Sequence, residues 1–152
     1  MVHGDAWHGG GALHLASGPH PDFLTDWGPL VQVFMTRLSG VSTFHETVYS
    51  TRFSHIAELV RMGAVVSLDD MPKTAAYGFT DVSREGQVLE IQGPTRLHGT
   101  TVTGDNLRGS AALLIAGLIA DGHTTVRGSE HLVRGYDNLI KRIRDLGADI
   151  AE

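Results

Sequence analysis

Residues 105–127 read DNLRGSAALLIAGLIADGHTTVR, a long apolar segment that ends near a glycine and continues into a threonine- and valine-containing run. The segment 107–120 is apolar on nearly every side, which is typical of a helix that is buried all round. Gly122 stands where helices commonly end, and residues 124–127 have the β-branched composition of a strand. The stretch therefore predicts an α/β fold with at least one helix inside the structure.

A second stretch, which begins at residue 26, follows the same order of elements as the stretch that begins at residue 105. Each contains a helix pattern, a glycine, a β-branched strand, a loop, a second helix and then Met-Gly-Ala or Leu-Gly-Ala. The spacing also matches, since 82 residues separate Gly40 from Gly122 and Arg52 from Arg134. Landmarks at a fixed spacing indicate a duplicated unit, although glycine after a helix is common enough to match by chance.

The other helices and strands follow from the periodicity of apolar residues. We expect a second all-round apolar helix at 27–38 and amphipathic helices around 53–60 and 136–146. Residues 69–86 are polar and predict a long loop or an extra hairpin. The fold class is predicted to be α/β with repeated units, in which helices are enclosed by sheets. The expected strands are 41–48, 64–68, 88–91, 100–103, 124–127 and 148–151.

The composition excludes several classes of protein. The 152 residues are 41% hydrophobic and 19% charged, with a net charge of −5, which rules out a disordered chain and predicts no binding to nucleic acid or membrane surfaces. Because the chain has no cysteine, it has no disulfide and no thiolate metal site, and this suits the cytoplasm. The longest apolar run, 111–120, is too short to span a bilayer, and the N-terminus lacks a signal-peptide pattern.

The histidines and the common ligand-binding motifs give no sign of a metal site. His3 and His8 flank Asp5 in a glycine-rich terminus, but no two of the nine histidines are four residues apart on an expected helix. No phosphate-binding loop or metalloprotease motif is present. We therefore expect no metal ion.

Four charged residues near helix starts could carry chemistry. Either Thr25 or Asp26 caps the helix that follows, or Asp26 is a carboxylate kept ionised by the helix N-terminus and able to accept a proton. Arg52 and Arg134, at matching places before amphipathic helices, are either surface arginines or groups that bind a carboxylate or phosphate. Arg108 adjoins an apolar segment, where a charge needs a partner, and Asp105 is near enough to supply one.

Four segments together resemble the UDP-N-acetylglucosamine 1-carboxyvinyltransferase family of enolpyruvyl transferases. The family pattern Pro-x-Pro-x-Phe-x-Thr-Asp matches PHPDFLTD at 19–26, and Glu-Thr-(Val/Ile)-(Phe/Tyr)-x-x-Arg-Phe-x-His matches ETVYSTRFSH at 46–55. Asp-Leu-Arg resembles NLR at 106–108, and Arg-Gly-Tyr followed by Leu-Gly-Ala matches residues 134–148. The likeness spans nearly everything after Ser17, apart from residues 69 to about 93.

The resemblance implies repeated βαβαββ-like units of the inside-out α/β barrel type, of which this chain supplies only a C-terminal portion. Residues 1–17 are expected to be a flexible or partial segment. Residues 18–152 would form one partial domain of two units, about 18–92 and 93–152. The implied reaction moves the enolpyruvyl group of phosphoenolpyruvate to the 3-hydroxyl of UDP-N-acetylglucosamine, in peptidoglycan precursor synthesis, and needs no metal or organic cofactor.

The resemblance also implies roles for individual residues at matching motif positions. Asp26 resembles the carboxylate that accepts the proton of the attacking sugar hydroxyl, with Thr25 beside it. Arg134 resembles the arginine that closes on phosphoenolpyruvate. Val48 and Tyr49 match positions that line the sugar-nucleotide site.

Further residues would support these groups. Arg52 would orient its loop and the charged part of the substrate. The remaining supporting residues implied by the Asp-Leu-Arg motif and its neighbour are Asp105, Asn106 and Arg108.

The chain departs from the family pattern in several places. The reactive cysteine of the family, on a loop of the other domain, is absent from this chain. Asn106 stands where the carboxylate of Asp-Leu-Arg is expected, with Asp105 one place earlier, so either the carboxylate is lost or the turn has slipped by one residue. Gly28 stands where a glutamine is expected, and residues 69–86 are longer than usual.

These departures leave other functions open. We expect little activity from the chain alone, because half of a cleft between two domains cannot assemble the reaction, and we expect a cysteine-bearing partner chain or self-association through uncovered apolar surface. One alternative is a related transferase with another acceptor, such as a nucleotide in antibiotic synthesis or shikimate-3-phosphate. The other is a scaffold domain without catalytic activity.

Overall fold

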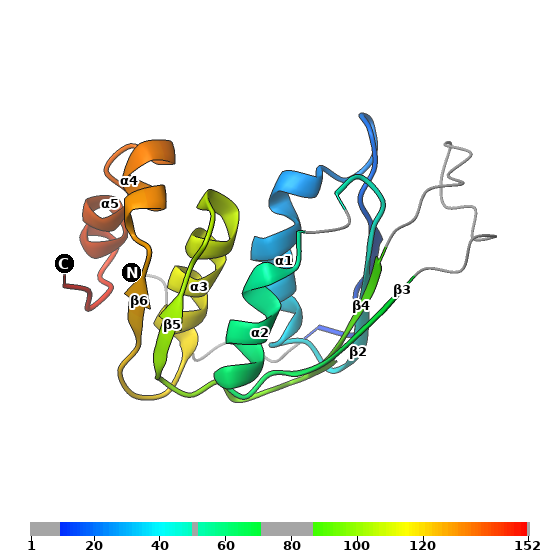
Figure 1. The fold of residues 1–152 in the computed structure, drawn as a ribbon. Coiled ribbons are helices and arrows are strands. Elements are labelled where there is room, and N and C mark those ends of the chain that lie inside the picture. Colours follow the sequence, from blue (N-terminus) through cyan, green and yellow to red (C-terminus); the bar gives the residue numbers. More distant parts are fainter. Residues whose placement is uncertain (1–9, 50–51, 71–86, 152) are drawn as a thin grey trace.

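The structure of the protein, a computed structural model, describes residues 10–49, 52–70 and 87–151. Most of the insertion at 69–86 therefore lies outside the described residues, and so do His3, Asp5 and His8. The described part forms two sheets with helices between them (Figure 1).

The larger sheet contains β1 (His14–Ala16), β2 (Gly40–Glu46), β3 (Val65–Asp70) and β4 (Gln87–Gly93). Its strand order is β1-β2-β4-β3. β1 runs parallel to β2, whereas β4 is antiparallel to both of its neighbours. The pairing of β2 with β4 runs without interruption from Gly40 opposite Gly93 to Glu46 opposite Gln87.

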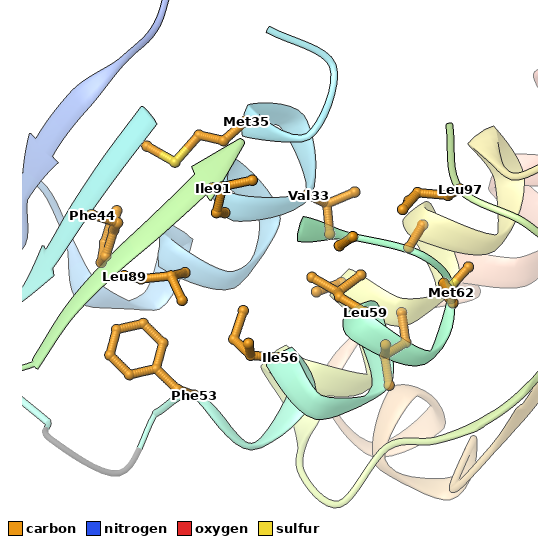
Figure 2. Close-up of a cluster of buried hydrophobic side chains, with 14 of the residues drawn as sticks. Val33, Met35, Phe44, Phe53, Ile56, Leu59, Met62, Leu89, Ile91 and Leu97 are labelled. Carbon is orange, nitrogen blue, oxygen red and sulfur yellow. The ribbon is translucent and has the colours of Figure 1, made fainter. Parts of the chain in front are cut away.

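Helices cover one face of this sheet and form the core with it. α1 (Gly28–Met35) follows the 3₁₀ turn η2 (Thr25–Trp27) and contacts β2 and β4, while α2 (Ser54–Arg61) contacts β3. Alternate residues of β2, among them Phe44 and Glu46, are buried, as expected for a strand with one covered face. Figure 2 shows the side chains that meet there; the fully buried ones include Met35, Phe44, Leu59, Met62, Leu89 and Ile91.

The smaller sheet is a parallel pair, β5 (Thr101–Thr103) and β6 (Thr125–Arg127), connected through α3 (Leu107–Ile119). α3 contacts α1 and α2 as well as both of these strands. The helices therefore lie between two sheets (Figure 1), which confirms the predicted α/β class with enclosed helices. Two short helices, α4 (Glu130–Gly135) and α5 (Leu139–Asp145), follow β6.

Both halves of the chain contain a parallel strand pair joined by a helix, β1-α1-β2 and β5-α3-β6. Gly40 and Gly122, at matching sequence positions, both have positive φ, 98° and 89°. L-residues with a side chain rarely adopt this conformation, so the same backbone requirement applies at both places. The division into units 18–92 and 93–152 stays a prediction. β1 lies within residues 1–17, the segment that we expected to be flexible or partial.

α1 is shorter and less buried than the sequence predicted. The helix ends at Met35, and the side chains of Trp27, Leu30 and Phe34 are 57%, 37% and 42% exposed. An apolar helix is buried all round only where other elements lie on every side, and these exposed fractions show that this face of α1 is only partly covered. The prediction of complete burial was therefore wrong for α1.

The C-terminal segment also differs from the prediction. The expected helix around 136–146 begins only at Leu139, because Tyr136 has extended backbone and Asn138 has a left-handed φ of 49°. Residues 148–151 do not form the expected strand. The physical reason is that a strand needs a neighbouring strand to pair with. β3, which follows the last helix of the first half as residues 148–151 follow the last helix of the second half, is paired with β4. Among the described residues, no strand lies beside β6 in the place that β4 takes beside β2.

Candidate active site

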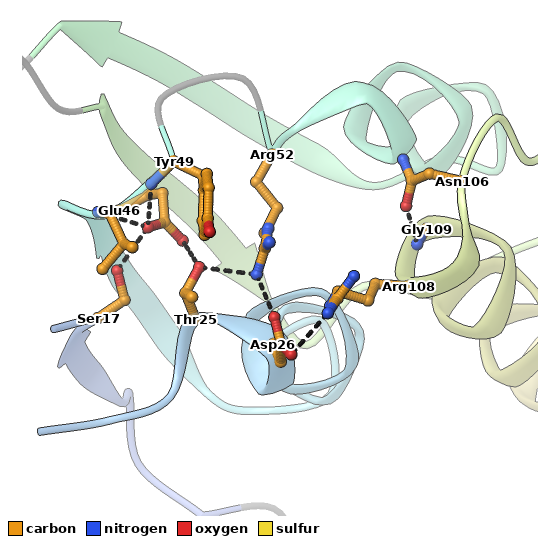
Figure 3. Close-up of polar contacts among 10 residues, drawn as sticks. Ser17, Thr25, Asp26, Glu46, Tyr49, Arg52, Asn106, Arg108 and Gly109 are labelled. Atoms are coloured by element: carbon orange, nitrogen blue, oxygen red, sulfur yellow. Dashed lines mark hydrogen bonds and ion pairs between the residues drawn. The ribbon is translucent and has the colours of Figure 1, made fainter. Parts of the chain in front are cut away.

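Asp26 lies where three segments of the chain meet (Figure 3). It belongs to η2, while Arg52 lies just before α2 and Arg108 lies in the first turn of α3. Arg52 Nη1 donates a hydrogen bond to Asp26 Oδ1 at 2.6 Å, and Arg108 Nη2 donates one to Asp26 Oδ2, also at 2.6 Å. The packing of α3 against α1 and α2 brings these distant residues together.

The two guanidinium groups favour the ionised form of Asp26. The hydrogen bond from Arg108 is the largest cause that lowers the pKa of Asp26, partial burial of the carboxyl opposes it, and Arg52 adds to the lowering. Asp26 in turn raises the pKa of Arg108 through the same hydrogen bond. Since half of the Asp26 side chain (50%) is exposed, this ionised carboxylate is accessible from solvent.

Asp26 does not cap α1, so that alternative for its role was wrong. Trp27 occupies the N-cap position, and no side chain there accepts a hydrogen bond from the first-turn amides. Pro29, which has no amide hydrogen, stands in the first turn instead. Because arginines engage both oxygens of Asp26, its geometry is that of a fixed, ionised carboxylate.

The partner expected for Arg108 was also wrong, since Arg108 pairs with Asp26 and not with Asp105. Asp105 Oδ1 instead accepts hydrogen bonds from Ser54 Oγ at 2.9 Å and from Asn106 Nδ2 at 2.6 Å. Asn106 caps α3, because its Oδ1 accepts a hydrogen bond from the amide of Gly109 at 2.9 Å. The side chains of Asp105 and Asn106 thus fix the start of α3, while Arg108 reaches toward η2 (Figure 3).

Arg52 connects Asp26 to two further residues that the sequence singled out. Only 16% of its side chain is exposed, and its Nη1 also donates a hydrogen bond to Thr25 Oγ1 at 3.0 Å. Its guanidinium lies over the ring of Tyr49, 4.3 Å from the ring centre. Tyr49 is 53% exposed and Val48 beside it is half-buried. These five residues form one contiguous group.

Glu46, which the sequence analysis missed, contacts this group through Thr25, Val48 and Tyr49. It lies at the end of β2, is 1% exposed, and accepts four hydrogen bonds through its carboxylate (Figure 3). A signal existed in the sequence, because Glu46 continues the inward-facing series of β2 and a buried charge needs partners. The donors are Ser17 Oγ (2.7 Å), Thr25 Oγ1 (2.7 Å) and the amides of Val48 (2.8 Å) and Tyr49 (2.9 Å).

Arg134 is not part of the Asp26 group in this structure. It lies in the last turn of α4 rather than at the entry to a longer helix, and its side chain is exposed. Among the described residues it makes no hydrogen bond or ion pair with Asp26, Arg52 or Arg108. Its predicted role therefore receives no geometric support from the contacts of this chain.

The described part of the chain contains neither a cluster of metal ligands nor a membrane-spanning helix. No group of three or more histidine, aspartate or glutamate side chains in residues 10–49, 52–70 and 87–151 could hold a metal ion. No helix in that part of the chain is long and apolar enough to cross a membrane.

Comparison with known proteins gives the family directly. The family model of EPSP synthase (3-phosphoshikimate 1-carboxyvinyltransferase) matches residues 8–143, most of the chain. The chain belongs to the EPSP synthase family. This family of 1-carboxyvinyltransferases is consistent with the resemblance that the four motifs predicted.

Relatives within the EPSP synthase family carry the name suggested by the motifs. The UDP-N-acetylglucosamine 1-carboxyvinyltransferase of Thermotoga maritima is 40% identical over 139 residues, which are 91% of this chain and 29% of the relative. UDP-N-acetylglucosamine 1-carboxyvinyltransferase 2 of Listeria monocytogenes is 40% identical over 131 residues, or 86% of this chain and 27% of the relative. The chain therefore spans less than a third of the length of these relatives, as the prediction of a portion requires.

Solved structures of EPSP synthase family members have the same fold. The enolpyruvyl transferase NikO from Streptomyces tendae matches 93% of this chain and 29% of its own, with a TM-score of 0.74 and 29% identity. EPSP synthase from Acinetobacter baumannii matches the same shares with a TM-score of 0.58 and 20% identity, a likeness of fold alone.

The structure gives physical reasons for two departures from the expected family pattern. Asn106 supplies the cap of α3, so the helix start does not need a carboxylate at this position. Its Nδ2 group also donates to Asp105, an arrangement that aspartate could not make. Gly28 faces the Phe44 ring, and a Cβ atom there would lie 3.0 Å from the nearest ring carbon, which favours glycine.

Proposed function

We propose that this chain is a portion of an enzyme that transfers the enolpyruvyl group of phosphoenolpyruvate to the 3-hydroxyl of UDP-N-acetylglucosamine. The proposal is supported by the name of relatives that are 40% identical over 91% of the chain. Because the chain matches only 29% of such a relative, the reaction needs the remainder of an enzyme as well.

The observation that carries the proposal is the Asp26 carboxylate, half exposed and held by two arginines at 2.6 Å each. In the proposed addition the sugar hydroxyl oxygen bonds to C2 of phosphoenolpyruvate while the C2=C3 π bond breaks; Asp26 accepts the hydroxyl proton, and C3 gains a proton. A carboxylate that is ionised and fixed in orientation suits this role, since proton acceptance needs both the right charge and the right position. The tetrahedral intermediate then loses phosphate from C2 and a proton from C3, which forms the double bond again.

The residues around Asp26 would bind and orient the substrates. Val48 and Tyr49 would line the sugar-nucleotide site, with Thr25 beside the reacting hydroxyl. Arg52 would hold both Asp26 and the charged part of a substrate, because a guanidinium has more donors than its present contacts use. Arg134 would bind phosphoenolpyruvate, and this role requires α4 or the substrate to bring it toward Asp26.

The remainder of the enzyme would close the site from the other side and cover the exposed face of α1. This face carries Trp27 and Leu30 at helical spacing, and exposed apolar side chains so arranged favour contact with another chain or a second copy. We propose that the reaction needs no metal ion or organic cofactor and that it takes place in the cytoplasm.

The test is a chimera in which this chain replaces the matching 139-residue stretch of the Thermotoga maritima relative. Phosphate release from phosphoenolpyruvate is measured with UDP-N-acetylglucosamine as acceptor, for the chimera, the unmodified relative and this chain alone. The proposal predicts activity from the chimera and none from the isolated chain, because only the chimera contains both sides of the cleft.

Shikimate 3-phosphate and a free nucleotide are tested as alternative acceptors in the same assay. Activity of the chimera with one of these, and none with the UDP-sugar, would replace the proposal by a related transferase. A chimera that is folded by circular dichroism but inactive with all acceptors would favour a scaffold domain without catalytic activity.

A further inference from the structure

We propose that Glu46 is a positioning residue that sets the direction of the hydrogen bonds running through Thr25 and Arg52 to Asp26. The positioning itself is a property of this chain, while its importance for catalysis rests on the proposed function. Nothing in the family motifs assigned a role to Glu46, and it has no contact with the solvent-exposed side of Asp26.

The carboxylate of Glu46 is buried and bound by donors of the protein itself, so its role is internal. Its Oε1 accepts hydrogen bonds from Ser17 Oγ, Val48 N and Tyr49 N, at 2.7, 2.8 and 2.9 Å. Its Oε2 accepts one from Thr25 Oγ1 at 2.7 Å. The side chain is 1% exposed, so these four protein donors replace the water that a carboxylate otherwise binds.

The direction of the bonds follows from the single proton of the Thr25 hydroxyl. A carboxylate can only accept, so Thr25 must donate its proton to Glu46. The Thr25 oxygen is then left with lone pairs alone, and these accept the hydrogen bond from Arg52 Nη1 at 3.0 Å. The other hydrogen of the same Arg52 nitrogen is directed at Asp26 Oδ1, 2.6 Å away.

Glu46 also acts on Arg52 from a second side. Its bonds to the amides of Val48 and Tyr49 fix the turn that follows β2. Tyr49 carries the ring over which the Arg52 guanidinium lies, at 4.3 Å. Arg52 is thus held between Thr25 and the Tyr49 ring, and Glu46 binds both supports.

The substitution Glu46→Gln keeps the shape of the side chain but reverses one hydrogen bond. The glutamine oxygen must take the place of Oε1, where three donors converge, so the amide NH₂ group faces Thr25. Thr25 then accepts this hydrogen with one lone pair, and its own proton takes one of the two remaining directions, where it competes with the hydrogen bond from Arg52. That hydrogen bond is weakened, and Arg52 is held less firmly against Asp26.

The experiment measures the pKa of the Asp26 carboxyl by carbon-detected NMR titration, in the complete chain and in the Glu46→Gln variant. Positioning predicts a higher pKa of Asp26 in the variant, by up to about 1 unit, because a less firmly held Arg52 stabilises the ionised carboxylate less. Removal of a negative charge alone would act in the opposite direction and lower the pKa of Asp26. An unchanged or lower pKa in Glu46→Gln overturns the proposal.

Further variants distinguish the hydrogen bonds through Thr25 and Arg52 from a general disturbance of the fold. Thr25→Val keeps Glu46 and removes only the relaying hydroxyl, so it must raise the pKa of Asp26 by a similar amount, and Thr25→Ser must not. Ser17→Ala removes a donor to Glu46 that does not lead to Arg52, and it should leave the pKa of Asp26 unchanged. If Glu46→Gln does not fold, Thr25→Val decides, and a value equal to that of the unmodified chain overturns the proposal.

The NMR result stands whatever reaction the enzyme catalyses, so it is independent of the proposed function. In the chimera, positioning further predicts that Glu46→Gln shifts the acidic limb of the pH–rate profile to higher pH. A shifted Asp26 pKa in an inactive chimera would support positioning and reject the transferase. An active chimera in which Glu46→Gln leaves the pKa of Asp26 unchanged would support the transferase and reject the positioning role of Glu46.

Discussion

Asp26 is held by two arginines that differ in their effect on its charge. The hydrogen bond from Arg108 contributes most to the lowered pKa, and Arg52 contributes less. We therefore expect Arg108→Gln to raise the pKa of Asp26 more than Arg52→Gln does. Site-resolved carboxyl titration by NMR gives both values, and a larger rise in Arg52→Gln would contradict the assignment.

His55 makes stability depend on pH through its burial in α2. Desolvation lowers the pKa of His55 to about 4, against a weaker opposing effect of Asp105, and no hydrogen-bond partner reaches its Nε2 in the described residues. Unfolded, His55 has a pKa near 6.5, so between pH 6.5 and 4 the unfolded state binds more protons. The stability from neutral His55 is thus complete above pH 6.5 and is lost as the pH falls toward 4.

We expect the free energy of unfolding to fall over this range by on the order of 3 kcal/mol from His55. Urea unfolding between pH 7 and pH 4 measures it. His55→Leu should flatten the pH dependence, whereas His123→Leu, at an exposed histidine, should not. An equally steep dependence in His55→Leu would assign the effect to other groups.

At the scale of elements, the start of α3 decides where Arg108 lies. Asn106 caps the helix through Gly109 N, and a cap lost in Asn106→Ala costs about 1 kcal/mol of stability. Asn106→Asp restores the family residue but places a second carboxylate against Asp105, whose Oδ1 lies 2.6 Å from Asn106 Nδ2. We expect Asn106→Asp to be less stable than the unmodified chain at pH 7. Adding Asp105→Asn to this variant should restore the lost stability. Urea unfolding of Asn106→Ala, Asn106→Asp and the double variant measures these stabilities. An Asn106→Asp variant that is more stable than the unmodified chain would contradict the expectation.

Periodicity predicted the elements that are complete within the chain, and it failed where a neighbour decides the structure. The strands at 41–48 and 88–91 were found because their apolar residues alternate. β1, only three residues long, has no pattern of its own and exists because β2 offers an edge. Residues 148–151 were predicted to be a strand, yet no strand lies beside them in the described part of the chain.

The site shows the same limit for side chains. The motifs placed Thr25, Asp26, Val48, Tyr49 and Arg52 in one region, and in the structure Arg52 contacts Thr25, Asp26 and Tyr49, next to which Val48 lies. The pairing of Arg108 with Asp26 and the buried Glu46 were not found. Both depend on contacts between segments far apart in sequence, which spacing within one segment does not reveal.

At the scale of the whole molecule, exposed apolar side chains at the start of α1 predict association. Trp27, at the N-cap of the helix, and Leu30, three residues later, are 57% and 37% exposed. We expect the molar mass from light scattering to rise with concentration, and the double substitution of both residues by glutamine to reduce this rise. Val133→Gln, at a 79% exposed side chain on α4, is the control. A monomer at all concentrations would contradict the expectation.

Phosphate release by the chimera carrying Asp26→Asn tests most directly whether this carboxylate accepts the proton of the sugar hydroxyl. Asparagine keeps the size of the side chain but accepts a proton far less readily, and loss of a general base lowers rates by about 10²- to 10⁴-fold. We expect a loss of at least about 100-fold, with the fold intact, while Asp149→Asn, at an exposed carboxylate, retains activity. A chimera that is active with UDP-N-acetylglucosamine and indifferent to Asp26→Asn would contradict the central claim that this carboxylate accepts the proton.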